Sequence, residues 1–319
     1  MSSRELAVVM DPIESIKPRK DSTLAMLLEA QRRGWKISYG QLHDIWLRDG
    51  EAFGHLTALQ VADDPVDWYK FGDRATTSLA DMDVILMRKD PPFDMEYIAA
   101  TYVLQRAEES GALVVNRPRS LRDANEKAFL AWFPDCAPPT LMSRSLREMR
   151  AFLAEHDQVV VKPLHLMAGQ SVFVTASADG NHNVILETVS QFGARYTILQ
   201  KYLPEIADSG DRRILLIDGE AIPMALARIP AHGDHRGNMV AGARTEVGPL
   251  TDREAWICER IGPLLRDSGL MFVGIDVIGD FMTEINVTSA TGIRELERAT
   301  DLRITEQLFD AISSKLAET

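Results

Sequence analysis

Three oxygen-bearing side chains near the C-terminus have the types and spacing of a metal site. Asp276 interrupts an apolar run, and Glu284 and Asn286 stand two positions apart in the next extended segment. A buried carboxylate needs a matching charge, because its unpaired burial is costly. Carboxylate and amide oxygens are ligands that Mg²⁺ accepts when substrate phosphates complete its coordination. We therefore predict a divalent metal site, for Mg²⁺ or Mn²⁺, at Asp276, Glu284 and Asn286.

The connection between the two segments decides whether these side chains can meet. A two-residue turn at Gly279-Asp280 alone would place Asp276 and Glu284 on opposite faces of the sheet, whereas a three-residue or bulged connection would place them on one face. We expect the second arrangement. The alternative is an acidic pair solvated on an edge strand, which leaves Asn286 without a reason, since Asn is a poor strand former.

Two lysines are candidates for binding phosphate. Lys162 ends the apolar run at residues 159–161, and Lys127 lies in an Asn-Glu-Lys sequence. A lysine at the end of a buried strand must reach a counter-charge or extend its ammonium to water. Phosphate oxygens would satisfy both lysines. Gln200 and the residues after it follow another predicted strand and could offer hydrogen bonds to an adenine edge.

The first third of the chain alternates between strands and helices. Asp21 can cap a helix that ends at Gly34, and a second helix is expected over residues 94–111. Asp49-Gly50 predicts the turn of a hairpin over residues 45–61. Short apolar segments predict buried strands at residues 6–10, 37–39, 83–88 and 113–116. This alternation implies a parallel sheet, so we expect an N-terminal α/β domain over residues 1–122.

The remaining chain is expected to form an α+β part in two domains, at residues 123–203 and 204–319. Ser145 with Glu148, and Thr251 with Glu254, fit helix capping boxes. Residues 231–248 are Gly-rich and lack periodicity, which predicts a long loop of the kind that forms functional lids. Further strands are expected at residues 159–161, 172–174 and 198–200. Hairpins are expected at residues 213–226 and 271–287, and a terminal helix at residues 301–317.

Composition excludes several classes of protein. The 319 residues carry 35 basic and 47 acidic side chains, a net charge of −12, and no basic stripe for nucleic acid. No apolar run is long enough to span a membrane, and no signal peptide is recognisable. The two cysteines form no metal-binding or disulfide pattern. P-loop, dinucleotide-binding, zinc-protease and nucleophile-elbow motifs are absent. We expect a soluble cytoplasmic protein that acts on small molecules.

Several strings resemble bacterial glutathione synthetase, a family with the ATP-grasp fold. They are collinear and cover nearly the whole chain, and the specific ones are MRKDPPFD at residues 87–94, NEK at 125–127 and TEINVTS at 283–289. The resemblance implies an ATP- and Mg²⁺-dependent ligase that activates the C-terminal carboxylate of γ-glutamylcysteine as an acyl phosphate for attack by glycine. The family also suggests a homo-oligomer.

The resemblance assigns roles to individual residues. It implies that Arg213 and Arg228 are catalytic, clamping the acyl phosphate or the transferred phosphoryl group. It implies binding of the dipeptide or acceptor by Arg88, Ser289 and Thr291, and of the metal by Asp276, Glu284 and Asn286. It implies that the residues binding ATP are Lys127, Lys162, Gly169, Gln200, Tyr202, Leu203 and Asp211.

The chain departs from the family on the phosphate and acceptor side. The family's Gly-rich phosphate loop, typically Asp-Gly-Met-Gly-Gly, is replaced by HLMAGQS at residues 165–171. Ala243 and Thr245 stand where glycines are usual, and Ala290 stands where proline is usual. We expect strain at Leu166 and Ala168 and a lowered kcat. Two alternatives stay open: a related ligase using another amine, and a weakly active or non-catalytic nucleotide-binding protein.

Overall fold

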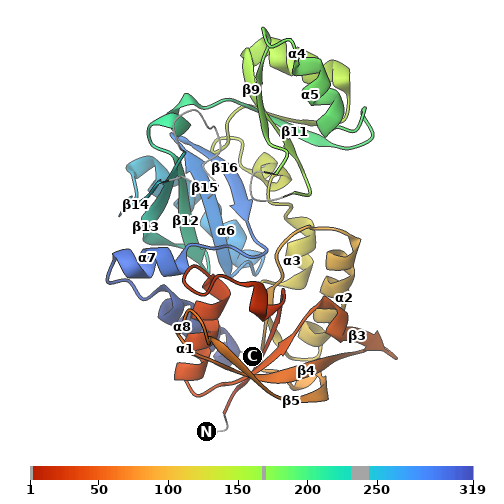
Figure 1. Cartoon of the computed structure of the whole chain (residues 1–319), viewed down its shortest axis with the longest axis vertical. Helices are drawn as coiled ribbons and strands as arrows, with labels where there is room; N and C mark the ends of the chain where they lie inside the picture. The colour runs from red at the N-terminus through yellow and green to blue at the C-terminus, as the bar shows by residue number, and fades with distance from the viewer. Residues whose placement is uncertain (1–2, 167–169, 231–243, 319) are drawn as a thin grey trace.

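The computed structural model describes residues 3–166, 170–230 and 244–318, and it arranges them around three sheets (Figure 1). The sheets follow one another along the chain and fall within residues 1–122, 123–203 and 204–319. Within the described ranges, five short 3-10 helices lie in the connections, at Ile13–Ser15, Leu42–Asp44, Leu79–Asp81, Ala128–Trp132 and Pro204–Ala207.

The N-terminal sheet has seven strands and is parallel in its centre, as predicted. Its parallel strands are β1 (Glu5–Met10), β2 (Lys36–Gly40), β6 (Val84–Arg88) and β7 (Leu113–Val115). Three antiparallel strands extend it: β3 (Ile45–Arg48), β4 (Glu51–Val61) and β5 (Tyr69–Ser78). The expected turn at Asp49-Gly50 joins β3 to β4, but the sequence analysis did not predict β5, whose side chains are mostly exposed.

Helices α1 (Ser22–Arg32), α2 (Met95–Glu109) and α3 (Pro118–Asp123) accompany this sheet. Asp21 caps α1, because its Oδ1 accepts a hydrogen bond of 2.6 Å from the amide of Leu24. Asp94 caps α2 in the same way. Each cap fixes where a helix begins after the loop that follows a parallel strand, β1 for α1 and β6 for α2.

The second sheet has four antiparallel strands in the order β10-β9-β11-β8. Its elements are β8 (Thr140–Ser143), α4 (Leu146–His156), β9 (Gln158–Pro163), β10 (Phe173–Ala176), α5 (His182–Val189) and β11 (Thr197–Lys201). Met149, Leu153 and Leu186 belong to a hydrophobic cluster confined to these elements. In Figure 1 this unit stands at one end of the molecule, next to the third sheet. We call it the lid domain.

The third sheet has five antiparallel strands in the order β14-β13-β12-β15-β16. The strands are β12 (Asp211–Ile217), β13 (Glu220–Ile229), β14 (Arg244–Pro249), β15 (Phe272–Ile278) and β16 (Phe281–Asn286). The helices are α6 (Asp252–Asp267), α7 (Ile293–Ala299) and α8 (Ile304–Glu318). Thr251 and Glu254 form the predicted capping box at the start of α6.

The part of the expected loop that lies within the described residues is a strand. Residues 244–248 belong to β14, which pairs with β13 from Met224↔Pro249 to Ile229↔Arg244. Backbone hydrogen bonds to β13 stabilise this strand, although its polar side chains show no apolar periodicity. Residues 231–243 lie outside the described residues, so the functional loop predicted over residues 231–248 is untested there.

The first and third sheets share their hydrophobic core. One cluster joins Val9 and Leu104 of the N-terminal part to Ile257 and Ile275, and a second joins Leu24 to Phe309 of α8. Trp35 and Phe309 lie with their ring centroids 5.1 Å apart. The described residues thus form the lid domain and a body built from both ends of the chain. The domain bounds at residues 122 and 203 stay predictions.

No helix among the described residues is long and apolar enough to cross a membrane.

Candidate active site

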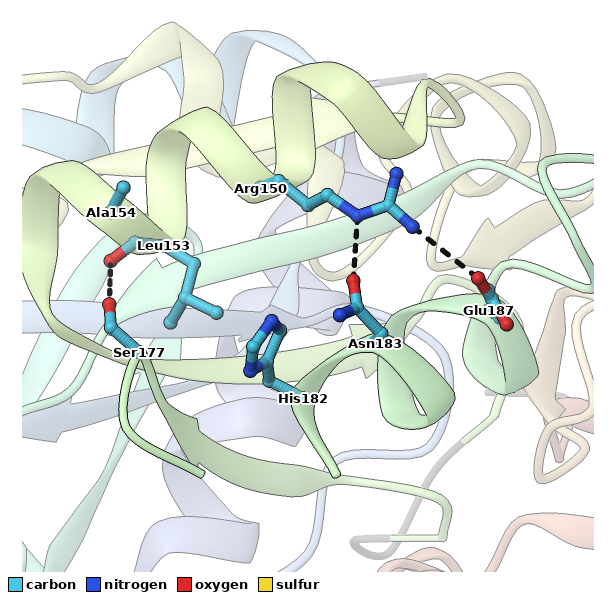
Figure 2. Close-up of a pocket in the computed structure, with 7 residues that line it drawn as sticks. All are labelled: Arg150, Leu153, Ala154, Ser177, His182, Asn183 and Glu187. Atoms are coloured by element: carbon cyan, nitrogen blue, oxygen red, sulfur yellow. Dashed lines mark hydrogen bonds and ion pairs between the residues drawn. The ribbon is translucent and has the colours of Figure 1, made fainter. Parts of the chain in front are cut away.

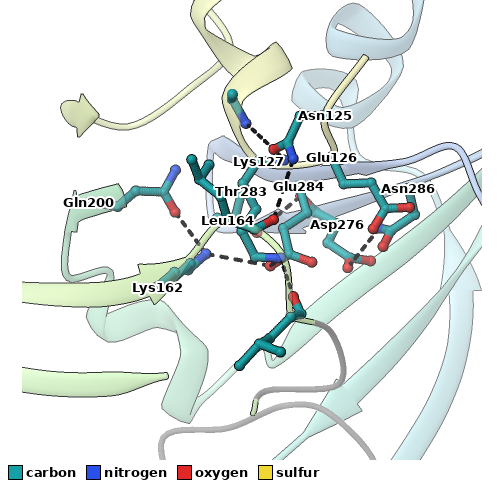
Figure 3. Close-up of polar contacts among 12 residues, drawn as sticks. Asn125, Glu126, Lys127, Lys162, Leu164, Gln200, Asp276, Thr283, Glu284 and Asn286 are labelled. Carbon is teal, nitrogen blue, oxygen red and sulfur yellow. Dashed lines mark hydrogen bonds and ion pairs between the residues drawn. The ribbon is translucent and has the colours of Figure 1, made fainter. Parts of the chain in front are cut away.

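The β15–β16 hairpin brings the predicted metal ligands to one face (Figure 3). Gly279 has a φ of +56° in a two-residue turn, with Ile278 paired to Phe281. A bulge then shifts the register, so that Asp276 pairs with Glu284. An extra residue in one strand restores the facing that the turn alone would prevent. The prediction of a bulged connection is confirmed.

Asp276 is the centre of a buried charge network. Its Oδ1 lies 2.5 Å from Nε of Arg213 and 2.8 Å from Nη2 of Arg228, and its Oδ2 lies 2.9 Å from Nη2 of Arg213. Asn286 donates through Nδ2 to the same Oδ2 and to the carbonyl of Gly274. The two guanidinium groups outweigh burial and hold the pKa of Asp276 well below its usual range. A carboxylate offers about four lone-pair positions, so these donors nearly saturate it.

Arg228 also pairs with Asp211, which lies opposite it in the β12–β13 register. Burial raises the pKa of Asp211 to about 7, with Arg228 opposing this and the charge of Asp276 adding to it. Oδ1 of Asp211 and Nε of Arg228 are buried without a hydrogen-bond partner among the described residues. The two arginines assigned to phosphate are thus engaged with carboxylates here, beside the place where phosphates are expected.

Both predicted phosphate lysines reach the same carboxylate. Nζ of Lys127 and Nζ of Lys162 each lie 3.9 Å from Oε1 of Glu284 (Figure 3). Lys162 also donates to Oε1 of Gln200 at 2.7 Å, and Lys127 donates to the carbonyl of Leu166 at 2.8 Å. Burial lowers the pKa of Lys162. Glu284 is therefore the counter-charge that the sequence required for these lysines.

The predicted adenine residues lie at the end of β11. Gln200 is buried and is held by Lys162 and by the hydroxyl of Thr140. Leu203 is buried, whereas Tyr202 is partly exposed and donates its amide to the carbonyl of Gln158. The structure thus brings Gln200 to Lys162, but it shows nothing that assigns an adenine slot.

Arg88 joins the N-terminal sheet to the segment that follows β16. It donates through Nε to Oγ1 of Thr23 at 3.0 Å and through Nη2 to the carbonyl of Ala290 at 2.8 Å. Arg213 donates to the carbonyl of Thr291 at 3.2 Å. Ser289 is half-buried and Thr291 is exposed. Arg88, Ser289 and Thr291 are therefore brought to one place, next to the charge network.

The substituted phosphate loop is only partly described. Gly169 and Ala168 lie outside the described residues, so their assignments are untested. Leu166 is not among the described residues with left-handed backbone, which in this loop is found at Ser171, with φ +54°. The strain expected at Leu166 is absent, because its backbone takes an ordinary conformation while its carbonyl accepts the ammonium of Lys127.

A metal ion fits the chemistry of this set of side chains with one condition. Glu284 and Asn286 present oxygen donors beside one another, as a hard divalent ion requires. Asp276 could take part only if one of its present donors moved aside. Within the described residues no group of three or more His, Cys, Asp or Glu side chains could hold a metal ion, so an amide or a substrate must complete any site.

A cavity of about 550 Å³ lies away from these side chains, between α4 and α5 on the lid domain (Figure 2). Arg150 crosses it, donating to Asn183 and pairing with Glu187, while His182 lies beside them. None of the predicted site residues lines this cavity. The candidate active site is instead the polar cluster where the lid domain meets β15 and β16.

Sequence reasoning missed two features of the site. It did not pair Arg213 and Arg228 with Asp276, because the pairing depends on the order of β12, β13 and β15. It also gave no role to Glu126, whose carboxylate contacts Val287 and Thr288. The available signal was the position of Glu126 beside Lys127.

The fold is similar to that of ATP-grasp ligases of known structure. A structure titled as ATP-grasp ligase PsnB with a precursor peptide and AMPPNP matches with a TM-score of 0.61 at 18% identity, covering 99% of each chain. The D-cycloserine synthetase DcsG matches with a TM-score of 0.66 at 15% identity, covering 98% of this chain and 99% of that one. At these identities the likeness concerns the fold alone.

Sequence comparison identifies the family. The model for the N-terminal domain of prokaryotic glutathione synthetase matches residues 5–122, and that for its ATP-grasp domain matches residues 126–301. Glutathione synthetase from Pseudomonas aeruginosa is 52% identical over 315 residues, covering 99% of each chain. That from Escherichia coli (strain K12) is 51% identical over 314 residues, covering 98% of this chain and 99% of its own. The chain belongs to the prokaryotic glutathione synthetase family and is an ATP-dependent ligase.

Proposed function

We propose that this enzyme joins γ-glutamylcysteine to glycine, with ATP converted to ADP and phosphate. The dipeptide's C-terminal carboxylate attacks the terminal phosphorus of ATP to give an acyl phosphate and ADP. The amine of glycine then attacks the acyl carbon, and phosphate leaves as the amide bond of glutathione forms. Membership of the family supports this reaction.

The observation that carries the proposal is the convergence of Lys127, Lys162, Asp276 and Glu284 where two sheets meet. Phosphoryl transfer depends on positioning and charge neutralisation rather than on covalent help from the protein. The two lysines would hold phosphate oxygens, and Gln200 and Leu203 would border the adenine. A divalent ion held by Asp276, Glu284 and Asn286, which we propose to be Mg²⁺, would supply further charge neutralisation at the phosphates.

The arginines act next to the proposed phosphate and metal site. Arg213 and Arg228 would stabilise the charge that develops on the transferred group, because both lie buried beside Asp276. Arg88 would orient the dipeptide with Ser289 and Thr291, since its guanidinium already contacts the segment that carries them. We further propose that the enzyme is cytoplasmic and forms a homo-oligomer.

The test is phosphate and ADP release with ATP, Mg²⁺ and γ-glutamylcysteine, with and without glycine, and mass spectrometry of the product. We expect release that requires glycine and a product with the mass of glutathione. Release only with another amine would show a different acceptor. Nucleotide binding without release would show a protein that does not catalyse the reaction.

A further inference from the structure

Glu126 fastens the outer edge of β16 beside the proposed metal ligands. Its backbone carbonyl accepts the amide of Ile285 at 2.9 Å. Its side-chain Oε1 accepts the amides of Val287 at 3.1 Å and Thr288 at 3.2 Å, and the hydroxyl of Thr288 at 2.8 Å. One residue thus satisfies four donors along a strand edge that would otherwise present unpaired amides.

The fastened segment connects the parts of the site. Glu284 and Asn286 lie directly before the contacts of Glu126, and Ser289 to Thr291 lie directly after them. The carbonyls of Ala290 and Thr291 accept hydrogen bonds from Arg88 and Arg213. Movement of residues 287–288 would therefore displace both the metal-binding side chains and the segment proposed to bind substrate.

The contact cannot be replaced easily. Val287 and Thr288 are buried, so an amide that lost its acceptor there would have no water to turn to. Burial raises the pKa of Glu126, and its hydrogen-bond donors and the charge of Lys127 oppose this shift. A half-buried carboxylate that accepts hydrogen bonds from consecutive backbone amides fixes the position of residues 287–288.

We propose that Glu126 is a positioning residue for the ligase reaction, acting through residues 287–288 on Glu284, Asn286 and the segment at Ser289–Thr291. The inference rests on the proposed function for its catalytic consequence. The set of hydrogen bonds from residues 287–288 to the Glu126 carboxylate, which we call the clamp, is a property of the ligand-free protein. Outer contacts that orient metal ligands typically change metal affinity or activity by about 10- to 100-fold when they are lost.

The chain offers a matched control in α7. Oε1 of Glu297 accepts the amide and the hydroxyl of Thr305, both at 2.8 Å, which is the same kind of clamp. It fastens the start of α8, away from the residues assigned to the site. A merely structural role for Glu126 would make the two glutamates behave alike.

The experiment compares the parent with Glu126→Gln, Glu126→Ala, Thr288→Val and Glu297→Ala. Hydrogen exchange of the ligand-free proteins measures the clamp, and kcat, KM for ATP and the Mg²⁺ concentration for half-maximal rate measure its effect. We expect Glu126→Ala to speed exchange at residues 287–288 by on the order of tenfold, to lower kcat by about 10- to 100-fold and to raise the Mg²⁺ requirement. KM for ATP should change less than kcat.

Glu126→Gln should recover most of the loss, because its amide oxygen can accept the same donors. Glu297→Ala should speed exchange only near Thr305 and leave kcat within about twofold of the parent. Unchanged exchange at residues 287–288 in Glu126→Ala, or unchanged kcat and Mg²⁺ requirement, would overturn the proposal. If Glu126→Ala does not fold, Thr288→Val provides the test. Parent-like hydrogen exchange and kcat in Thr288→Val would then overturn the proposal. A parent without ligase activity contradicts the proposed function, whereas the exchange data still test the clamp.

Discussion

Asp276 and Glu284 face each other across one hairpin, yet their surroundings differ. Asp276 is 3% exposed and pairs with two buried arginines, whereas the side chain of Glu284 is 22% exposed and its lysine neighbours lie 3.9 Å away. The same chemical role in metal binding would therefore have different consequences for stability.

Replacing each carboxylate should separate catalysis from folding. Glu284→Gln should lower kcat by at least about 100-fold and should lower the urea midpoint less than Asp276→Ala does, because the contacts of Glu284 with Lys127 and Lys162 are longer, at 3.9 Å. Asp276→Ala should also abolish turnover, but it should cost about 3–5 kcal/mol of stability, because Arg213 and Arg228 lose their buried partner. ADP release and urea unfolding measure the two effects. A parent-like rate for Glu284→Gln at saturating Mg²⁺ contradicts the metal assignment, and equal stability of the two variants contradicts the network.

Asp211 should make stability depend on pH. Burial raises its pKa from 3.8 to about 7, so the folded protein holds this proton to higher pH than the unfolded chain does. Its contribution to stability is therefore greatest below about pH 4 and is lost as the pH rises to about 7. Asp211→Asn removes that slope. Urea unfolding at pH 5 and pH 8 should show a larger decrease for the parent than for the variant, and parallel decreases would contradict the assignment.

At the scale of elements, Asn116 joins the end of β7 to the hairpin that carries the site. Its Nδ2 donates to the carbonyls of Phe272 at 2.8 Å and Val287 at 2.7 Å, and its Oδ1 accepts the amide of Phe272 at 2.8 Å. Asn116→Ala leaves these buried backbone groups unpaired and should destabilise the protein by about 3 kcal/mol or more. Asn183→Ala, on the surface of the lid domain, is the control and should have little effect. Urea unfolding measures both, and equal midpoints would show that Asn116 is not a fastening point.

The sequence predicts these elements where local signals are strong. Caps at Asp21 and Thr251, and the apolar run of β1, mark elements that the structure contains. Strands β5 and β14 escaped prediction because their side chains are mainly polar and exposed, and pairing with β4 and β13 decides their conformation. The likeness to a known family reached further than periodicity, since it relates positions that are distant in the chain.

The same distinction between local sequence signals and strand pairing applies to the site. The facing of Asp276 and Glu284 could be inferred from two strands and one turn. The pairing of Arg213 and Arg228 with Asp276 could not, because it needs the register of β12 with both neighbouring strands. The sequence predicted that both lysines bind phosphate, but it did not indicate that both pair with Glu284 in the ligand-free protein.

At the scale of the whole molecule, the proposed nucleotide site joins the lid domain to the body. Lys162 and Gln200 come from the lid domain, and Lys127, Asp276 and Glu284 come from outside it. ADP with Mg²⁺ should stabilise the whole protein, by about 2.7 kcal/mol at 100 times its Kd. Thermal unfolding should show this shift for the parent and for Lys36→Ala, an exposed control, and a smaller shift for Lys162→Ala at the same ligand concentration. Equal shifts for Lys162→Ala and the parent would contradict nucleotide binding by Lys162.

The packing of α8 on α1 has a consequence for synthesis in the cell. Leu308, Phe309 and Ile312 complete the hydrophobic cluster that contains Leu24 and Leu27 of α1. The ribosome makes α1 almost three hundred residues before α8, which at about 5–20 residues per second is a delay of roughly 15–60 s. During that time the part of α1 that α8 later covers has no permanent cover, although β2 and β4 already pack on the same helix. This part of α1 is a liability for aggregation during synthesis, and a truncation that removes α8 makes that liability permanent.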